Sequence, residues 1–131
     1  MVSLKINAMD HIVLNVRDVE RSLAFYSGVL GLKPERVEEY RAGKITFPSV
    51  RISESCLIDL VTYDAPGATR KNLAHFCLTA DAIDLDALAS SLEAQGVTIT
   101  TRPVSRWGAR GQATSIYLLD PDENEIEIRH Y

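Results

Sequence analysis

Two histidines stand at matching places in two similar halves of the chain. His11 and His75 each lie in a short run of apolar residues that reads as a strand. Each half also ends in an apolar strand with one central acid, Asp59 in the first half and Glu127 in the second. A carboxylate is costly to bury unless something pairs with it. Two imidazoles with one or two carboxylates are what a divalent metal site needs, so the repeated pattern predicts such a site.

The alternation of side chains along a strand predicts where these four residues point. In the first strand Ile12 and Leu14 share one face and are expected to pack under a helix, which leaves His11 on the other face. The same count places His75, Asp59 and Glu127 away from the helices. If the sheet curls, the four side chains converge on its concave face. Glu125 is expected to be solvated or to pair with Arg129.

Helix signals recur once in each half. Asp18 is a good N-cap, and apolar residues at helical spacing predict a helix over 19–30. In the second half Asp84 or Asp86 caps a helix with a similar apolar stripe, which Gly96 ends. A strand that carries a histidine precedes each helix, and extended segments follow it.

The extended segments complete a β-α-β-β-β plan in each half. The predicted strands are roughly 35–40, 45–52 and 56–62 in the first half and 97–101, 114–119 and 125–130 in the second. We expect one domain, 1–131, made of modules 7–63 and 72–131 with a linker over Tyr63–Thr69. The predicted fold class is α+β, with two tandem βαβββ modules forming a cupped, barrel-like mixed sheet and helices outside.

Composition narrows the classes of protein that the chain can belong to. A chain of 131 residues is one ordinary domain, and a net charge of −4 argues against a general nucleic-acid binder. No apolar stretch is long enough to cross a bilayer and the start lacks a signal-peptide core, so we expect a cytoplasmic protein without a membrane partner. Cys56 and Cys77 lack metal-type spacing and are expected to be reduced and buried.

The segment 102–112 is long, polar and rich in arginine, and it includes the only tryptophan. It is either a solvated loop or a flap that closes over a ligand. As a flap it would place an aromatic ring over an apolar or planar ligand and an arginine against a carboxylate or phosphate. Tyr117 is a candidate proton donor. The predicted substrate contacts are Arg51, Arg106, Trp107 and Arg110.

Three stretches resemble the vicinal oxygen chelate superfamily, the glyoxalase, bleomycin-resistance and extradiol dioxygenase group. They are Met9–Val16, Arg21–Leu32 and Tyr117–Ile128, and the resemblance that they carry runs over nearly the whole chain. The likeness is nearest to the glyoxalase-domain-containing proteins. Glu123 stands where the family usually has glycine, so a non-glycine residue must adopt the conformation of that turn.

The resemblance implies a divalent metal, whose identity among Zn, Ni, Fe, Mn and Co stays open. Carried over by position, His11, His75 and Glu127 are the family's commonest ligands. Asp59 falls where glyoxalase I enzymes place a fourth ligand, and it is otherwise a general base or the partner of a histidine. Small members of the family are commonly homodimers, so we expect a homodimer here.

The function implied is a metal-dependent, glyoxalase-like lyase or isomerase. Its substrate would be a small oxygenated molecule that binds the metal through two adjacent oxygens. Glu127, Asp59 and Tyr117 are the predicted catalytic residues. One alternative is a single-domain extradiol-type dioxygenase. Another is a binding protein of the bleomycin-resistance kind, which would sequester a small molecule or antibiotic without turnover.

Overall fold

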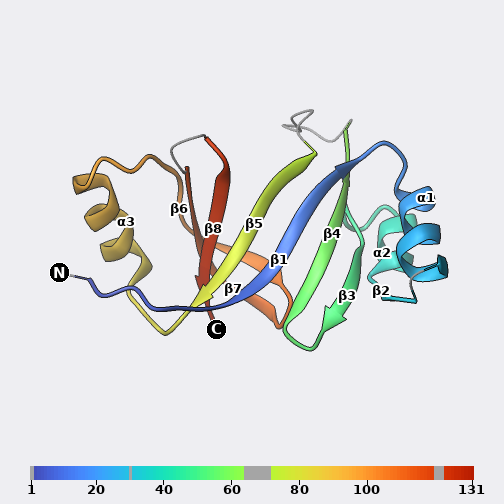
Figure 1. The fold of residues 1–131 in the computed structure, drawn as a ribbon, viewed down its shortest axis with the longest axis horizontal. Helices are drawn as coiled ribbons and strands as arrows, with labels where there is room; N and C mark the ends of the chain where they lie inside the picture. The colour runs from blue at the N-terminus through green and yellow to red at the C-terminus, as the bar shows by residue number, and fades with distance from the viewer. Residues whose placement is uncertain (1, 30, 64–71, 120–122) are drawn as a thin grey trace. The chain divides into compact units, whose positions relative to one another are not determined.

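The computed structural model describes residues 2–29, 31–63, 72–119 and 123–131 (Figure 1). These residues form two compact units. Unit 1 comprises the described residues of Met1–Asp10 and His75–Tyr131, and unit 2 comprises those of His11–Ala74. The chain therefore passes from one unit to the other at His11 and again at His75. Of the linker predicted over Tyr63–Thr69, all but its first residue lies outside the described residues.

Unit 2 is a mixed sheet with its helices on one side. Its elements are the second half of β1 (Ile6–Val16), α1 (Val19–Leu23), the π-helix η1 (Ala24–Val29), β2 (Lys33–Glu35), α2 (Val37–Arg41), β3 (Ser49–Ser53) and β4 (Cys56–Thr62). The strand order is β2-β3-β4-β1, in which β1 and β4 are parallel and the other pairs antiparallel (Figure 1). Val19 and Leu23 of α1 pack against Val50 and Leu60 in the core of the unit.

The predicted first helix begins where the sequence indicated. Asp18 has an extended backbone, and its side chain accepts a hydrogen bond from the backbone N–H of Arg21 at 3.2 Å, which confirms the N-cap. Only Val19–Leu23 is α-helical, because the chain continues over Ala24–Val29 as a π-helix.

The strand predicted over 35–40 is wrong. β2 ends at Glu35, Arg36 takes a left-handed backbone conformation with φ 59°, and α2 follows over Val37–Arg41. Val37 and Tyr40, three residues apart, both pack on the core of unit 2, which is helical rather than strand spacing. In the neighbouring prediction, 45–52, the strand begins only at Ser49.

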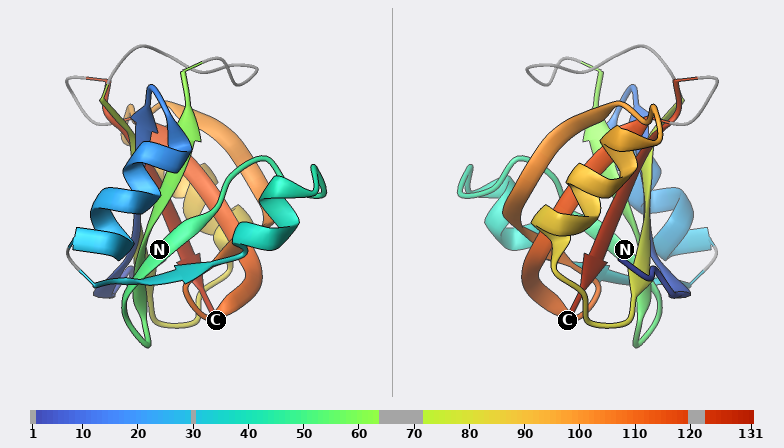
Figure 2. Two further views of the ribbon diagram at one scale, coloured as in Figure 1. Left: turned by 90° about the vertical axis from the view of Figure 1, so that its right-hand side faces the viewer. Right: turned by 90° about the vertical axis from the view of Figure 1, so that its left-hand side faces the viewer.

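Unit 1 is the second mixed sheet. Besides the first half of β1, its elements are β5 (Leu73–Ala80), which begins at the end of unit 2, α3 (Leu85–Ala94), β6 (Ile99–Gly108), β7 (Gly111–Leu119) and β8 (Glu125–His130). The strand order is β5-β8-β7-β6, in which β5 and β8 are parallel and the other pairs antiparallel. The N-cap of α3 is Asp84, and Figure 2 shows the helix against the strands of its unit. Leu88 and Ala89 pack there against Ile116 and Ile128.

The segment 102–112 is not a solvated loop, so that reading is wrong, whereas its role as a flap over a ligand stays a prediction. β6 and β7 form a long hairpin whose tip is Gly108–Gly111, and Gly111 turns the chain with φ 102°. β6 is an edge strand with mostly exposed or half-buried side chains and two register shifts. Its sequence therefore lacks the regular apolar alternation that identifies a strand.

The predicted α+β class is confirmed, since each unit combines a mixed sheet with helices on one face. The predicted faces of two strands hold as well. Leu60 of β4 and Ile128 of β8 lie in the helix-side cores, whereas Asp59 and Glu127 do not. Glu123 has φ 64°, as its place in the turn required. Among the described residues no helix is long and apolar enough to cross a membrane.

Candidate metal centre

The first candidate pair, His11 and Asp59, belongs to unit 2. β1 and β4 are parallel neighbours in which Val13 lies opposite Asp59, so His11 and Asp59 point to the same face. Both side chains are 2% exposed. The Nε2 atom of His11 lies 3.8 Å from Oδ2 of Asp59. The sequence therefore brings one imidazole and one carboxylate together inside this unit.

A serine holds the other oxygen of Asp59. Ser49 on β3 lies opposite Asp59 on β4, and its Oγ donates a hydrogen bond to Oδ1 at 2.5 Å. Ser49 is fully buried. Asp59 also acts on Arg36, whose pKa is lowered by burial, while the nearby carboxylate opposes this shift. Asp59 is thus an oriented carboxylate with Oδ2 turned toward an imidazole.

The second candidate pair, His75 and Glu127, belongs to unit 1. β5 and β8 are parallel neighbours in which Cys77 lies opposite Glu127. The Nε2 atom of His75 lies 3.1 Å from Oε1 of Glu127. Glu127 is 1% exposed and His75 is 17% exposed, so only the imidazole has access to solvent.

Two donors hold the other oxygen of Glu127. Oε2 accepts hydrogen bonds from Oγ of Ser115 at 2.7 Å and from Nη1 of Arg129 at 3.1 Å. Ser115 and Arg129 are both fully buried. Glu125 was expected to be solvated or to pair with Arg129; it accepts an exposed hydrogen bond from Thr100 at 2.9 Å, whereas Arg129 pairs with Glu127. The charge of Glu127 is therefore balanced inside the unit.

The two pairs share one arrangement, and their donor atoms are of the types that divalent transition metals bind. In each unit a buried serine lies on the antiparallel strand next to the carboxylate and donates a hydrogen bond to one carboxylate oxygen. The other oxygen faces the Nε2 atom of an imidazole. Two atoms bound to one metal at about 2.1 Å lie about 3.0–3.5 Å apart for common bond angles. The His75–Glu127 spacing matches this range, and the His11–Asp59 spacing is wider.

Tyr117 lies beside the second pair. It is opposite Glu127 on β7, and its ring meets the ring of His75 edge-on with centroids 5.4 Å apart. Burial raises the pKa of the Tyr117 phenol, and the negative charge and hydrogen bonding of Glu127 raise it further. Tyr117 is therefore a protonated phenol at neutral pH, which can donate a hydrogen bond but is a weaker acid than an ordinary tyrosine.

The four predicted substrate contacts have separate places in the structure. Arg51 on β3 pairs with Glu35 at 2.5 Å and donates to two turn carbonyls. The other three lie at the tip of the β6–β7 hairpin. Arg106 is exposed, Trp107 is half-buried, and the guanidinium of Arg110 lies 4.2 Å from the ring centre of Tyr131. Their part in substrate binding stays a prediction.

Sequence reasoning missed the groups that hold the carboxylates. Ser49 and Ser115 carry no local signal, because a serine in a strand becomes informative only when its cross-strand partner is known. It also missed Asp10, which is fully buried and accepts hydrogen bonds from Tyr131 Oη at 2.6 Å and from the backbone N–H of Ala109 at 2.9 Å. The available signal for Arg129 was that it shares a strand face with Glu127.

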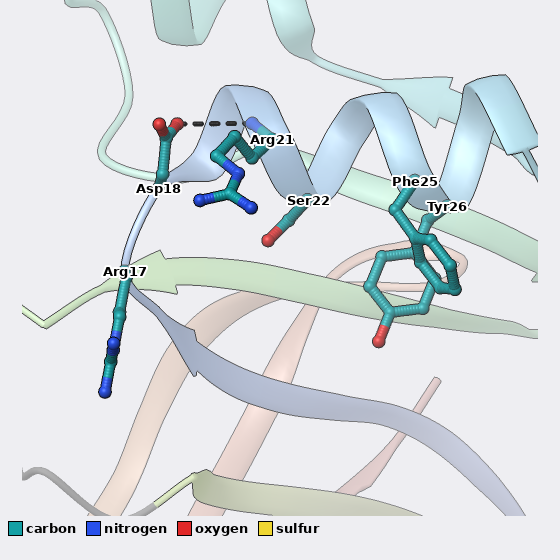
Figure 3. A pocket seen from close by; sticks show the side chains of 6 residues that line it. All are labelled: Arg17, Asp18, Arg21, Ser22, Phe25 and Tyr26. Atoms are coloured by element: carbon teal, nitrogen blue, oxygen red, sulfur yellow. Dashed lines mark hydrogen bonds between the residues drawn. The ribbon is translucent and has the colours of Figure 1, made fainter.

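A pocket of about 520 Å³ lies elsewhere in unit 2, beside α1 and η1 (Figure 3). Its lining residues are Arg17, Asp18, Arg21, Ser22, Phe25 and Tyr26. Asp18 is engaged as the N-cap of α1, and the rings of Phe25 and Tyr26 meet edge-on with centroids 5.2 Å apart. None of the predicted ligands or substrate contacts lines this pocket.

Comparisons with known proteins complete the description. Residues 8–128 match the family described as "Glyoxalase/Bleomycin resistance protein/Dioxygenase superfamily". The virulence protein STM3117 of Salmonella typhimurium is 32% identical, over 99% of this chain and 88% of that protein. The glyoxalase domain-containing protein RDO1 of Mycosarcoma maydis is 24% identical, over 98% of this chain and 70% of that protein. The Mn(II)-bound glyoxalase from Novosphingobium aromaticivorans has the same fold, with a TM-score of 0.71 and 20% identity over 98% of this chain and 40% of that one.

Proposed function

The chain belongs to the Glyoxalase/Bleomycin resistance protein/Dioxygenase superfamily, as its sequence resemblance predicted, and on that premise we propose that it is a metal-dependent enzyme of the lyase or isomerase type. Its substrate would be a small oxygenated molecule that presents two adjacent oxygens. The superfamily includes metal-dependent enzymes, and the similar glyoxalase from Novosphingobium aromaticivorans binds Mn(II).

The observation that carries this proposal is the repeated histidine–carboxylate pair with its buried serine. We propose that His11, His75 and Glu127 hold a divalent metal, with Asp59 as a fourth ligand or as the proton acceptor. When bound, the metal would supply Lewis acidity, which lowers the barrier to removing a proton from the carbon next to a carbonyl.

The chain's own groups can divide the proton transfers between them. Oε2 of Glu127 already accepts hydrogen bonds from a serine and from a buried cation, which leaves this oxygen less accessible to a substrate proton. Asp59 is oriented by Ser49 with Oδ2 directed away from that contact, so we assign Asp59 the acceptance of the substrate proton. Tyr117, protonated at neutral pH, would donate a hydrogen bond to an oxygen of the substrate.

The hairpin tip completes the proposal. Arg106 and Arg110 would pair with a carboxylate or phosphate of the substrate, with Trp107 against its apolar part. Arg51 already has an acidic partner in Glu35, so its predicted contact would need that ion pair to open.

One distance in the structure favours a second candidate. The 3.8 Å separation of His11 and Asp59 is wider than the spacing of adjacent ligands, which suits a three-ligand site without Asp59. Two histidines and one carboxylate with open positions are typical of non-haem Fe(II) oxygenases. The alternative is therefore a single-domain extradiol-type dioxygenase.

Metal analysis followed by a proton-exchange assay tests the proposal. Protein purified without an affinity tag or chelator is analysed by inductively coupled plasma mass spectrometry, and we expect about one transition metal per chain. The loaded protein is then incubated in D₂O with a panel of α-ketoaldehydes and α-hydroxyketones, and exchange of the C–H next to the carbonyl is followed by NMR. Sedimentation equilibrium of the same sample tests the homodimer, which we include in the proposal.

The possible outcomes separate the three functions. Nickel, zinc, cobalt or manganese with enzyme-dependent exchange supports lyase or isomerase chemistry. Iron or manganese with oxygen uptake on catechols, and no exchange, supports the dioxygenase. If the protein contains no metal and takes up none from an added panel, the enzyme proposal is wrong and a binding role replaces it.

A further inference from the structure

Arg129 is a charged side chain with no access to solvent. It lies on β8 in unit 1 and is 0% exposed. Its Nη1 donates to Glu127 at 3.1 Å and to the carbonyl of Trp107 at 3.3 Å. Its Nη2 donates to the carbonyls of Arg106 at 2.8 Å and Gly111 at 3.0 Å. The guanidinium therefore connects one carboxylate to three backbone groups around the hairpin tip.

This connection fixes which oxygen of Glu127 faces His75. Arg129 and Ser115 both donate to Oε2, and Oε1 lies 3.1 Å from the imidazole. A terminal carboxylate torsion is broad and two-fold when nothing holds it. The two donors on Oε2 restrict that freedom, and the guanidinium that supplies one of them is itself held by backbone carbonyls.

We propose that Arg129 is a positioning residue that orients Glu127 for metal binding and couples this carboxylate to the tip of the β6–β7 hairpin. The inference rests on the proposed function, because it takes Glu127 as a metal ligand. It goes beyond that function by making metal affinity depend on the conformation of the hairpin tip. A ligand that moves the carbonyls of Arg106 or Trp107 would then change the affinity for metal.

Gly108 offers a way to disturb Arg129 without replacing it. A Cβ atom at Gly108 would lie 2.6 Å from Cζ and Nη1 of Arg129 and 2.6 Å from Oη of Tyr131. Both contacts are with the ends of side chains, so Gly108→Ala displaces them rather than the backbone. Gly28, in unit 2, is the matched control, because a Cβ atom there would meet nothing within 4 Å.

The experiment compares the affinity of Mn(II) for the wild-type protein, Gly108→Ala, Gly28→Ala and Arg129→Lys by competition with a chelator of known affinity. Loss of a group that orients a ligand weakens metal binding by about 10- to 100-fold, and we expect this loss in Gly108→Ala and Arg129→Lys. Gly28→Ala should match the wild type. Tyr131→Phe, which removes the other group that the new methyl meets, should also keep its affinity.

A spectroscopic measurement separates positioning from a general loss of stability. At saturating Mn(II), the electron paramagnetic resonance spectrum reports the symmetry of the ligand field, and we expect altered zero-field splitting in Gly108→Ala and Arg129→Lys only. If both variants bind Mn(II) as the wild type does, with an unchanged spectrum, the positioning role is refuted while the metal site stands. If the wild-type protein itself binds no metal, the proposed function fails, and the inference fails with it.

Discussion

The ion pair between Glu127 and Arg129 makes a quantitative prediction about the metal-free protein. Both side chains are at most 1% exposed, and Nη1 and Oε2 lie 3.1 Å apart. Replacing Glu127 by leucine leaves a buried guanidinium whose remaining acceptors, within the described part of the chain, are backbone carbonyls. Removing one partner of a buried pair typically costs about 3–5 kcal/mol. Because Arg129 keeps its hydrogen bonds to backbone carbonyls, we expect the lower end of this range, a loss of about 3 kcal/mol in the free energy of unfolding of Glu127→Leu.

The second half of the prediction concerns the double variant. Arg129→Met leaves a buried carboxylate supported by Ser115 and His75, and we expect a similar loss. In the variant with both substitutions neither charge remains, so most of the lost stability should return. For a chain of 131 residues, with an unfolding entropy of about 0.28 kcal/mol/K, a loss of 3 kcal/mol lowers Tm by about 11 °C.

The assay is urea denaturation in the presence of a chelator, which removes any contribution from metal. The control is Glu20→Leu, which breaks an ion pair with Arg41 that is shorter, at 2.7 Å, but whose side chains are about half exposed. Exposed pairs contribute about 0–1 kcal/mol, so this variant should stay near the wild type. A loss below 1 kcal/mol in Glu127→Leu, or a double variant no more stable than the weaker single one, would refute the reasoning.

Three further predictions concern metal, orientation and pH. His75→Ala should abolish stoichiometric metal binding, measured by mass spectrometry, whereas His130→Ala should not; full metal content in the first variant contradicts the site assignment. Ser49→Ala should lower kcat about tenfold with metal content unchanged, because Asp59 loses its orienting hydrogen bond; an unchanged kcat would exclude that role. Burial is the larger cause, and the hydrogen bond to Asp10 the second, of the raised pKa of Tyr131 in the folded state. Its stabilising contribution is therefore complete below pH of about 10 and declines above it. Tyr131→Phe should show a smaller loss of stability than the wild type between pH 9 and 11, and an equal loss would contradict the shift.

The strands that could be predicted from the sequence are those whose apolar pattern lies within one short stretch of the chain. The strand predicted over 56–62 coincides with β4, which is a short apolar run, and the one over 125–130 coincides with β8, in which apolar and polar residues alternate. An acid at the centre of such an apolar pattern is a strong signal. For this reason the burial of Asp59 and Glu127 could be expected before their partners were known.

Other elements depend on contacts that a linear pattern does not contain. β2 ends at Glu35, and Arg36 takes a left-handed backbone conformation before α2 begins. No conformational preference of arginine predicts this. β6 reads as a loop because it is an edge strand with few buried side chains. The serines that orient the carboxylates act across strands, so their roles required the registers of β3 with β4 and of β7 with β8.

Each candidate pair lies wholly within one of the two units. His11 is the first residue of unit 2 and His75 is the residue at which the chain returns to unit 1. Each histidine has its carboxylate inside the unit that it opens, and each carboxylate has its serine there too. Domain swapping between two copies would therefore redistribute whole pairs without dissolving either one. Each pair and its serine lie within one continuous stretch of sequence, residues 11–74 or 75–131. Recombination or duplication of either stretch would therefore transmit a histidine, a carboxylate and its orienting serine together.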